Sequence, residues 1–321
     1  MSALLSVTDL SVQFRTRSGV VRALDRIGFE LRASEILGIV GESGSGKSTL
    51  AFAILGLLDR AARVTSGSVT FEGRDLLAMR RAELDELRGR DASLVFQNPH
   101  AALNPIRTVG AQIADVIARH TPAPADVVRH KTLEALRAVR IADPEQRSRA
   151  LPWELSGGMR QRVGIAIAMA CAPRLLIADE PTTGLDVTTQ AAILDLLRDM
   201  ATRRGVGIVL ITHDLSLAWR ACDRVAVMHA GHVVETAPAD ALFDHPRHPY
   251  SAGLIRSAPS AVASLSALEP IAGQAPDLRR ADLPPCRFSE RCARHQAVCD
   301  APGLAPQAVG ADRMVLCRRP L

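Results

Sequence analysis

Short apolar runs, each bounded by glycine or polar residues, recur along this chain and are its clearest pattern. Three such runs cover residues 35–40, 175–178 and 208–211. Continuous apolar runs of this length are typical of strands that are buried on both faces, as in a parallel sheet. Residues 1–35 instead alternate between apolar and polar positions, which predicts an antiparallel edge layer.

Helical patterns fill much of the chain between the first two runs. Residues 49–58 have the length and apolar content of a helix, whereas residues 97–170 carry several helical patterns interrupted by prolines. Since proline ends or kinks a helix, the longer stretch predicts an inserted helical subdomain. The expected fold class is therefore α/β: a mostly parallel sheet with an N-terminal antiparallel β layer, an inserted helical subdomain and a small Cys-rich C-terminal extension.

A glycine-rich loop joins the first apolar run to the helix that follows it, and the loop fits the pattern G-x-x-x-x-G-K-[ST]. Its residues are Gly41, Glu42, Ser43, Gly44, Ser45, Gly46, Lys47, Ser48 and Thr49. Backbone N–H groups of such a P-loop approach phosphate oxygens, and the helix adds its positive dipole end. Lys47 is expected to reach the β- and γ-phosphates of ATP, and Ser48 to bind Mg²⁺. Only one other lysine, Lys131, occurs in the chain, so Lys47 is not incidental.

Acidic residues and a histidine follow the other two apolar runs. They matter because a P-loop alone is shared by GTPases, kinases, helicases and transport ATPases. Asp179 can order Mg²⁺ through water, and Glu180 is placed to polarise the water that attacks the γ-phosphate. His213, at the tip of the third run, can hydrogen-bond the γ-phosphate and sense its loss. The sequence therefore predicts hydrolysis of a nucleoside triphosphate on a P-loop NTPase core.

Two further motifs make the class specific: Gln97 lies within Val95–Asn98, and LSGGMRQR occupies residues 155–162. With them, residues 1 to about 240 resemble the ATPase subunit of an ABC transporter. The resemblance assigns the Walker A loop to 41–49, the Q-loop to Gln97, Walker B to Asp179 and Glu180, the D-loop to Leu185 and Asp186, and the switch histidine to His213. It implies catalytic roles for Glu180, His213 and Gln97, and Mg²⁺ ligation by Ser48, Gln97 and Asp179.

The signature segment offers a second anion-binding helix terminus. Ser156 supplies a hydroxyl, Gly157 and Gly158 expose backbone N–H groups, and Gln161 completes the motif. The resemblance implies that this segment closes over the ATP held by a partner ATPase. ATP then joins two subunits, and its hydrolysis releases them.

Adenine recognition departs from the family pattern. Related ATPases often place an aromatic residue just before a glycine of the first hairpin, where this chain has Ser18 before Gly19. Phe14 lies four residues earlier and is expected to pack in the core instead. The sequence therefore names no adenine-stacking residue.

Charge and hydropathy indicate which classes of partner the chain can have. The net charge is +5 and the isoelectric point about 9.2, but the positive residues are mostly scattered arginines without interleaved aromatic residues. We therefore expect no nucleic-acid partner. No apolar run approaches the ~20 residues that span a bilayer, and no signal-peptide pattern begins the chain. A peripheral position on the cytoplasmic face of the plasma (inner) membrane, reached through partners, is expected.

The segment Phe243–Tyr250 is similar to the HPY element of the oligopeptide, dipeptide and nickel group of ABC importers, and GESGSGKS is typical of that group. Locally, Tyr250 and Leu254 are expected to pack on the core. The resemblance implies a homologous second ATPase (most simply in a heterodimer), two membrane permease subunits and an extracytoplasmic solute-binding protein as partners. Residues 1–240 would form the ATPase domain, with its helical subdomain at about 97–170, and residues 241–321 the extension.

Four cysteines gather near the C-terminus with the spacing C-x5-C-x6-C-x17-C: Cys286, Cys292, Cys299 and Cys317. A disulfide framework is not expected in a cytosolic chain, so the spacing predicts a metal site. Zinc usually begins with a tighter pair, whereas wide spacings are compatible with a [4Fe–4S] cluster. The resemblance to dipeptide-importer ATPases favours the cluster, with zinc as the alternative and a structural role for either.

The resulting expectation is an ATP-binding and ATP-hydrolysing subunit that energises a peptide-type or nickel ABC importer. The alternative is an ABC-type ATPase of DNA repair or chromosome handling, which would carry a long coiled coil or a large DNA-binding insertion. A ribosome-acting ABC protein would carry two ATPase halves in one chain. The sequence has no long coiled coil and no large DNA-binding insertion, and it has one set of ATPase motifs. The transported solute is not readable from an ATPase subunit.

Overall fold

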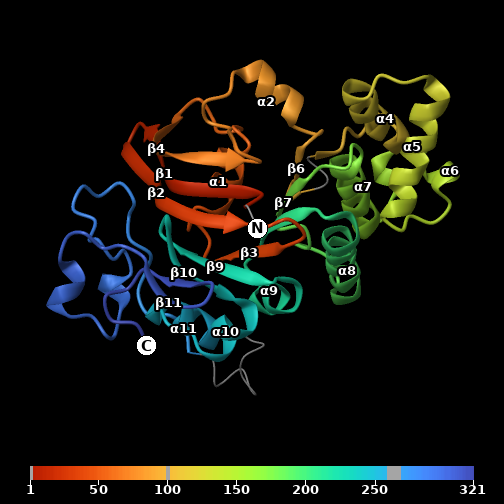
Figure 1. Ribbon diagram of the computed structural model, residues 1–321. Helices are drawn as coiled ribbons and strands as arrows, with labels where there is room; N and C mark the ends of the chain where they lie inside the picture. The colour runs from red at the N-terminus through yellow and green to blue at the C-terminus, as the bar shows by residue number, and fades with distance from the viewer. Residues whose placement is uncertain (1–2, 99–101, 259–268) are drawn as a thin grey trace. The chain divides into compact units, whose positions relative to one another are not determined.

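The computed structural model describes residues 3–98, 102–258 and 269–321. The chain divides into two compact units, one formed by Met1–Ala78 and Leu210–Leu321, the other by Met79–Val209. Strand β8 (Gly207–Ile211) runs across this division. Figure 1 shows the course of the chain through both units, each of which is described by itself below.

The first unit contains the predicted antiparallel layer. Its strands β1 (Leu5–Thr16), β2 (Gly19–Leu31), β4 (Ala62–Phe71) and β5 (Arg74–Asp75) are ordered β2-β1-β4-β5. Alternate side chains of β1 are buried, as the pattern predicted, until the register shifts after Val7. Asp9 has a φ of 47° at this irregularity, and the next buried residue is Leu10. A bulge of this kind inserts one residue and bends the strand, so the alternation slips there.

The second sheet of this unit carries the phosphate loop. Parallel strands β3 (Ile36–Val40) and β9 (Arg224–His229) are followed by antiparallel β10 (His232–Pro238), β12 (Arg313–Val315) and β11 (Gln307–Gly310). All five residues of β3 are buried, which confirms the strand predicted from its apolar run. Helices α1 (Lys47–Ile54), α9 (Leu215–Ala221), α10 (Ala239–Asp244) and α11 (Pro249–Arg256) complete the unit.

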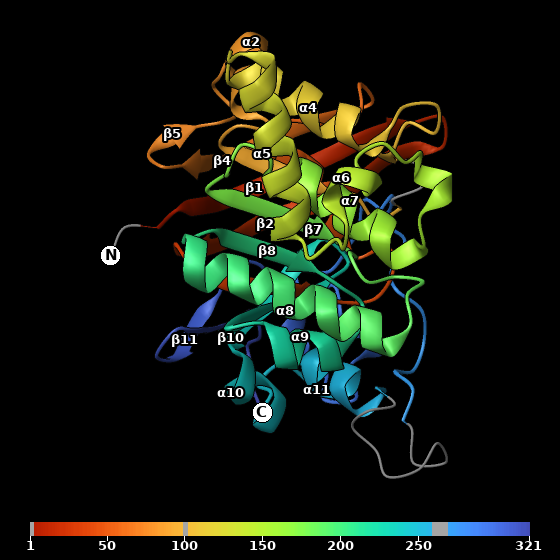
Figure 2. The same cartoon turned by 90° about the vertical axis from the view of Figure 1, so that its right-hand side faces the viewer.

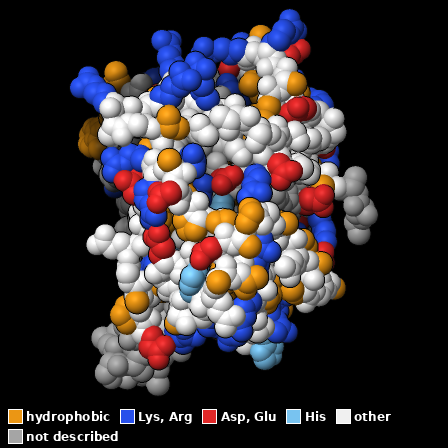
Figure 3. Space-filling view, turned by 90° about the vertical axis from the view of Figure 1, so that its left-hand side faces the viewer, with side chains coloured by type: hydrophobic (Ala, Val, Ile, Leu, Met, Phe, Trp, Pro, Cys, Tyr) orange, Lys and Arg blue, Asp and Glu red, His pale blue; other side chains and the backbone are white. Residues whose placement is uncertain are grey.

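The C-terminal segment, residues 269–321, is built into this unit rather than standing apart from it. Strand β12 pairs with β10, and the Glu235 carboxylate of β10 accepts a hydrogen bond from Arg313 of β12 at 2.8 Å. Two short 3₁₀ turns, Ser289–Arg291 and Ala297–Asp300, lie between α11 and β11. The surface view in Figure 3 shows Lys and Arg side chains interspersed with Asp and Glu side chains on one face.

The second unit combines two strands with a group of helices. Strands β6 (Ala92–Val95) and β7 (Leu175–Asp179) pair in parallel, which confirms the second predicted strand. Helices α4 (Val109–His120), α5 (Ala125–Ala138) and α7 (Gly157–Met169) lie side by side in Figures 1 and 2. The remaining helices are α2 (Arg81–Leu87), α6 (Pro144–Arg147), the 3₁₀ turn Pro152–Glu154 and α8 (Val187–Arg204). Within the described residues, no helix is long and apolar enough to cross a bilayer.

Candidate active site

The phosphate loop turns between β3 and α1, where the sequence placed it. Gly41 has a φ of 152°, and a Cβ built there would lie 2.1 Å from the carbonyl oxygen of Met228. Only glycine fits so close to neighbouring backbone. Gly46 caps α1 in the left-handed region with no side-chain hydrogen bond, so the helix N-terminus carries no competing cap. An unblocked helix N-terminus of this kind suits a phosphate group.

The Lys47 side chain lies across the inside of this loop. Its Nζ donates hydrogen bonds to the carbonyl oxygens of Gly41 at 2.8 Å and Glu42 at 3.0 Å, and the residue is only 7% exposed. Ser48 is exposed in the first turn of α1. Its hydroxyl is the kind of hard oxygen donor that Mg²⁺ accepts. Lys47 and Ser48 thus both lie in the first turn of α1, beside the loop, and their contacts with phosphate and Mg²⁺ stay predictions.

The Glu42 side chain of the loop is contacted by residues from two other parts of the unit. Arg291 donates to both carboxylate oxygens, at 2.8 and 2.9 Å, and His229 Nδ1 lies 3.6 Å from Oε2. The backbone N–H of Glu42 donates to the Tyr250 hydroxyl at 3.0 Å. Hydrogen bonding by His229, and then by Arg291, lowers the pKa of Glu42 to about 2. Glu42 is therefore a fixed carboxylate at neutral pH.

His213 follows β8 and precedes α9 in the same unit as the loop. Its side chain is exposed, and the next residue, Asp214, caps α9 by accepting from the N–H groups of Ser216 and Leu217. The cap fixes the point at which the helix begins, directly after the histidine. The structure thus places His213 at a strand tip, as predicted.

In the second unit, the ends of the two parallel strands bring Gln97 and Glu180 together. Val95 of β6 is in register with Ala178 of β7, so the residues two positions further along also lie at neighbouring strand ends. Gln97 Nε2 donates to Glu180 Oε2 at 2.7 Å. The Thr183 hydroxyl donates to the same oxygen at 2.9 Å. Residues 83 positions apart in sequence thus share one hydrogen bond.

Glu180 itself has a strained backbone. Its φ is 47°, a region that residues other than glycine seldom occupy, whereas Asp179 ends the buried strand β7 and is 5% exposed. Strain at such a residue persists only when its surroundings hold it, and it is concentrated at functional positions. The strained turn directs Glu180 away from the strand and toward Gln97 and Thr183.

The signature segment begins α7, and the Ser156 hydroxyl caps the helix by accepting from the N–H of Met159 at 3.3 Å. A Cβ at Gly158 would lie 2.5 Å from Cγ2 of Thr189 in α8. Asp186, at the start of α8, accepts from Thr189 N–H and hydroxyl at 2.9 and 2.7 Å. Gly158 therefore lets the signature and the predicted D-loop approach each other closely.

Gln161 differs from the rest of the predicted signature set. Its side chain is 2% exposed, and its Nε2 has no hydrogen-bond partner among the described residues. Ser156, by contrast, is exposed. A direct contact of Gln161 with a partner's nucleotide stays a prediction.

Comparison with known proteins agrees with this geometry. The model of the ABC transporter family matches residues 24–183, and that of the oligopeptide/dipeptide transporter C-terminal region matches residues 234–299. A probable peptide ABC transporter ATP-binding protein of Sinorhizobium fredii is 47% identical over 92% of this chain and 89% of its own. The dipeptide transport ATP-binding protein DppD of Haemophilus influenzae is 43% identical over 99% of this chain and 96% of its own. This chain belongs to the ABC transporter ATP-binding family.

Solved structures support the same assignment for the ATPase. The dimeric post-hydrolysis structure of the ATP-binding cassette MJ0796, bound to ADP and phosphate, has a TM-score of 0.66 and 26% identity, covering 73% of this chain and 98% of that one. ATP hydrolysis coupled to transport is the activity of the family. The comparisons do not support the alternative of a DNA-repair or chromosome ATPase.

The two residues considered for adenine stacking both lie in the first hairpin. Ser18 lies exposed in the turn between β1 and β2, next to Gly19. Phe14 is half-buried rather than a core residue, paired on β1 with Val21 and Ala62. Both lie in the first unit with the phosphate loop.

The four C-terminal cysteines line one small cavity of about 20 Å³, together with His248 and His295. Burial is the main cause that raises the pKa of Cys286 to about 11, and the other three thiols raise it further. At neutral pH the Cys286 thiol therefore keeps its proton unless a metal ion displaces it. Among the described residues, however, no three His, Cys, Asp or Glu side chains are arranged as ligands of one metal ion. The four thiols line the same cavity, but in the described residues they do not have the arrangement of ligands around one metal ion.

Sequence reasoning missed several contacts at the phosphate loop. Tyr250 is fully buried, as expected for packing, but its hydroxyl also bonds the loop. Arg291 and His229 carried no sequence signal, because a lone arginine or histidine marks no site by itself. Thr183 could have been found, since it lies three residues after Glu180 in the turn that follows Walker B.

Proposed function

We propose that this chain is the ATP-hydrolysing subunit that energises a peptide-type ABC importer. The contact that carries the proposal is the 2.7 Å hydrogen bond between Gln97 and Glu180. It joins the proposed water-activating carboxylate to the residue that begins the helical segment of the chain. A movement of the Gln97 side chain therefore alters the hydrogen bonding of the Glu180 carboxylate directly.

The phosphate loop would bind ATP through its backbone N–H groups and through Lys47, which now bonds two loop carbonyls. Bound Mg²⁺ would neutralise phosphate charge, held by oxygen donors of Ser48, Gln97 and Asp179. His213 would donate a hydrogen bond to the γ-phosphate. These assignments rest on matching motifs and on the placement of each residue within its own unit.

Glu180 would act as the general base. It accepts a proton from the attacking water while a bond forms from the water oxygen to the γ-phosphorus. The bond from that phosphorus to the β–γ bridging oxygen breaks, which releases ADP and phosphate. In the structure Gln97 and Thr183 both donate to Oε2 of Glu180, and these two hydrogen bonds orient the carboxylate.

Partners follow from the family resemblance and from exposed apolar side chains. Ser156, Gly157, Gly158 and Gln161 would act on ATP held by a homologous second ATPase, so a dimer forms around two nucleotides. Phe96, directly before Gln97, is 47% exposed, and Ile106 is 85% exposed. Exposed apolar residues of this kind suit contact with membrane permease subunits. The subunit would thus lie peripherally on the cytoplasmic face of the inner membrane, and an extracytoplasmic binding protein would deliver the solute.

We further propose that residues 1–240 form the ATPase domain, with the helical subdomain at 97–170, and residues 241–321 the transporter-specific extension.

Cys286, Cys292, Cys299 and Cys317 would hold a [4Fe–4S] cluster, with zinc as the alternative. Their convergence on one cavity supports a shared metal. Because that cavity has little free volume, a four-iron cluster requires the thiols to move outward, whereas a single zinc ion requires less movement. Iron, sulfide and zinc analysis of anaerobically purified protein decides between them.

The test of the general base is Glu180→Gln. A well-placed general base contributes about 10²- to 10⁴-fold to rate, so we expect turnover to fall by that factor while ATP still binds and dimers accumulate. Glu86→Gln, at an exposed position of α2, is the matched control and should hydrolyse ATP as the parent does. Turnover of Glu180→Gln near the parent's value contradicts the assignment.

A further inference from the structure

The C-terminal segment holds the phosphate loop at the Glu42 side chain. Arg291 makes two hydrogen bonds to that carboxylate, and its own side chain is only 4% exposed. Its guanidinium also lies 5.8 Å from the ring centre of Phe288. A bidentate pair between an almost buried arginine and a carboxylate fixes distance and direction together, unlike the exposed pairs of a protein surface. The loop is therefore held in one orientation from outside the ATPase core.

A buried aromatic cluster supports the same contact. Tyr250, whose hydroxyl accepts from the Glu42 N–H, lies 4.3 Å from the His229 ring and 5.3 Å from the Phe288 ring, measured between ring centres. His229 is at the end of β9, and Phe288 belongs to the C-terminal segment. Helix α11, strand β9 and the C-terminal segment thus pack together around Tyr250, the residue that bonds Glu42 of the loop.

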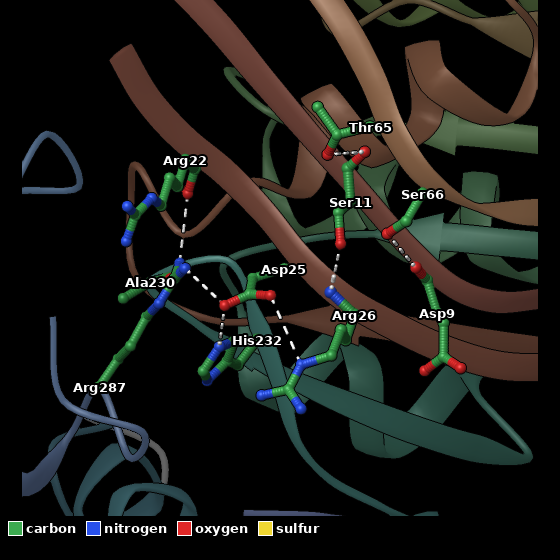
Figure 4. Close-up of polar contacts among 10 residues, drawn as sticks. All are labelled: Asp9, Ser11, Arg22, Asp25, Arg26, Thr65, Ser66, Ala230, His232 and Arg287. Atoms are coloured by element: carbon green, nitrogen blue, oxygen red, sulfur yellow. Dashed lines mark hydrogen bonds and ion pairs between the residues drawn. The ribbon is translucent and has the colours of Figure 1, made fainter. Parts of the chain in front are cut away.

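A second arginine of the segment reaches the loop by a different route (Figure 4). Arg287 donates to Asp25 at 2.9 Å and to the carbonyl oxygens of Arg22 and Ala230, and its side chain is 2% exposed. His232 lies 3.2 Å from the same Asp25 oxygen. Arg287 thus bonds the Ala230 carbonyl from the side of the C-terminal segment. In Figure 4 the dashed lines from Arg287, His232 and Arg26 converge on Asp25.

Gly231, the residue after Ala230, connects this contact to the phosphate loop through a backbone hydrogen bond. The N–H of Gly231 donates to the carbonyl oxygen of Ser45 at 2.9 Å, and its own carbonyl accepts from Asp25 N–H at 2.9 Å. A Cβ at Gly231 would lie 2.8 Å from Arg287, so the packing there is close. The loop is thus restrained at Glu42 by one arginine and near Ser45 by another.

Both arginines adjoin cysteines of the four-thiol cavity. Arg287 directly follows Cys286, and Arg291, the last residue of the 3₁₀ turn Ser289–Arg291, directly precedes Cys292. We expect an event that orders or loosens residues 286–292 to shift both arginines, because each is covalently next to a cysteine. Nothing in ATP chemistry requires such a connection between a peripheral cysteine segment and the phosphate loop.

We propose that Arg287 and Arg291 are positioning residues that couple the four-cysteine segment to the phosphate loop, so that an ordered segment tightens ATP binding. By reciprocity, bound ATP stabilises the segment to the same extent. The proposal rests on the ATP site proposed above. It assigns the extension a part in setting nucleotide affinity, in addition to any part in holding a metal.

The first experiment measures the dissociation constant of a fluorescent ATP analogue on the full chain. We expect Arg291→Met to weaken binding by about tenfold, within the range of ordinary coupling between sites. The rate at saturating ATP should change little, because Arg291 does not touch the reacting atoms. Arg279→Met is the matched control: its arginine pairs with Asp277 on the surface and makes no described contact with the loop. Arg291→Lys keeps the charge without the bidentate geometry, so its dissociation constant should lie between those of the parent and Arg291→Met.

The pair is tested by a double-mutant cycle with Glu42→Gln. If Arg291 acts through Glu42, the double variant binds the analogue about as weakly as Arg291→Met alone, because the two residues share one interaction. Additive losses, or parental affinity in Arg291→Met, overturn the proposal. Lys47→Ala separates this failure from failure of the ATP site itself: parental affinity in that variant would refute the phosphate loop instead.

The reciprocal effect is measured by hydrogen exchange, which needs neither turnover nor a particular metal. Adding ATP to the parent should slow amide exchange in peptides covering residues 286–299, and the same addition should have a smaller effect in Arg291→Met, where only the contacts of Arg287 remain. Equal protection of these peptides in both proteins contradicts the coupling.

Discussion

The carboxylate of Glu42 offers a measure of how firmly His229 of β9 and Arg291 of the C-terminal segment together hold the phosphate loop. Its pKa is lowered from 4.5 to about 2 in the folded protein, mainly by His229 and Arg291. A difference of this size corresponds to about 3 kcal/mol at most. Because the side chain is 32% exposed, solvent screening reduces the expected contribution to about 1–2 kcal/mol.

The perturbation is Glu42→Gln, which keeps the shape and removes the charge. A carboxyl group with a depressed pKa contributes stability above its unfolded pKa and loses it as the pH falls toward the folded value. The parent should therefore be more stable than the variant at pH 7, and the gap should close between about pH 5 and pH 2. Urea unfolding followed by circular dichroism at several pH values measures the two free energies of unfolding.

Asp277→Asn supplies the control. The pKa of Asp277 is also lowered to about 2, chiefly by its hydrogen bond with Arg279, but this pair lies on the surface. Its removal should leave the unfolding free energy nearly unchanged at each pH. A gap between the parent and Glu42→Gln that stays constant from pH 7 to pH 3 would refute the electrostatic account of this contact.

Three further substitutions test the close packing and the thiols. Gly41→Ala should abolish binding of the ATP analogue, because its Cβ would meet the Met228 carbonyl oxygen at 2.1 Å; measurable affinity would refute the tight turn. Gly158→Ala should cost about 1–3 kcal/mol of stability by overpacking, as read from urea unfolding, since its Cβ would lie 2.5 Å from Thr189 Cγ2. Adding Thr189→Ser, which lacks that methyl group, should restore most of the loss, and failure to do so argues against the clash. Cys286→Ser should remove bound iron or zinc as measured by elemental analysis, and an unchanged metal content rules this cysteine out as a ligand.

Local patterns predicted the fold well because each depends on neighbouring residues. The unbroken apolar runs became the buried strands β3, β7 and β8, and alternation in the first residues became the antiparallel layer. The bulge at Asp9 was missed, since alternation alone does not show where one residue is inserted. Phe14 was expected in the core, but it lies near the exposed end of its hairpin and is only half-buried.

The site was predictable where a motif fixes geometry and unpredictable where the fold joins distant segments. The turn at Gly41 follows from its glycine pattern, and Lys47 from its spacing within that pattern. The contact between Gln97 and Glu180 depends on the register of two parallel strands, which the sequence does not state. The pair of Arg291 with Glu42 spans 249 positions and has no local signal at all.

Tyr250 is the single tyrosine of the chain, and its hydroxyl accepts a hydrogen bond from the phosphate loop. In protein labelled with isotopes in tyrosine alone, every ring signal of the nuclear magnetic resonance spectrum would therefore come from this residue. Those signals would report the state of the loop in unmodified protein, inside a complete transporter as well as in the isolated subunit. The chain thus carries its own spectroscopic probe at the point where its C-terminal segment meets the nucleotide site.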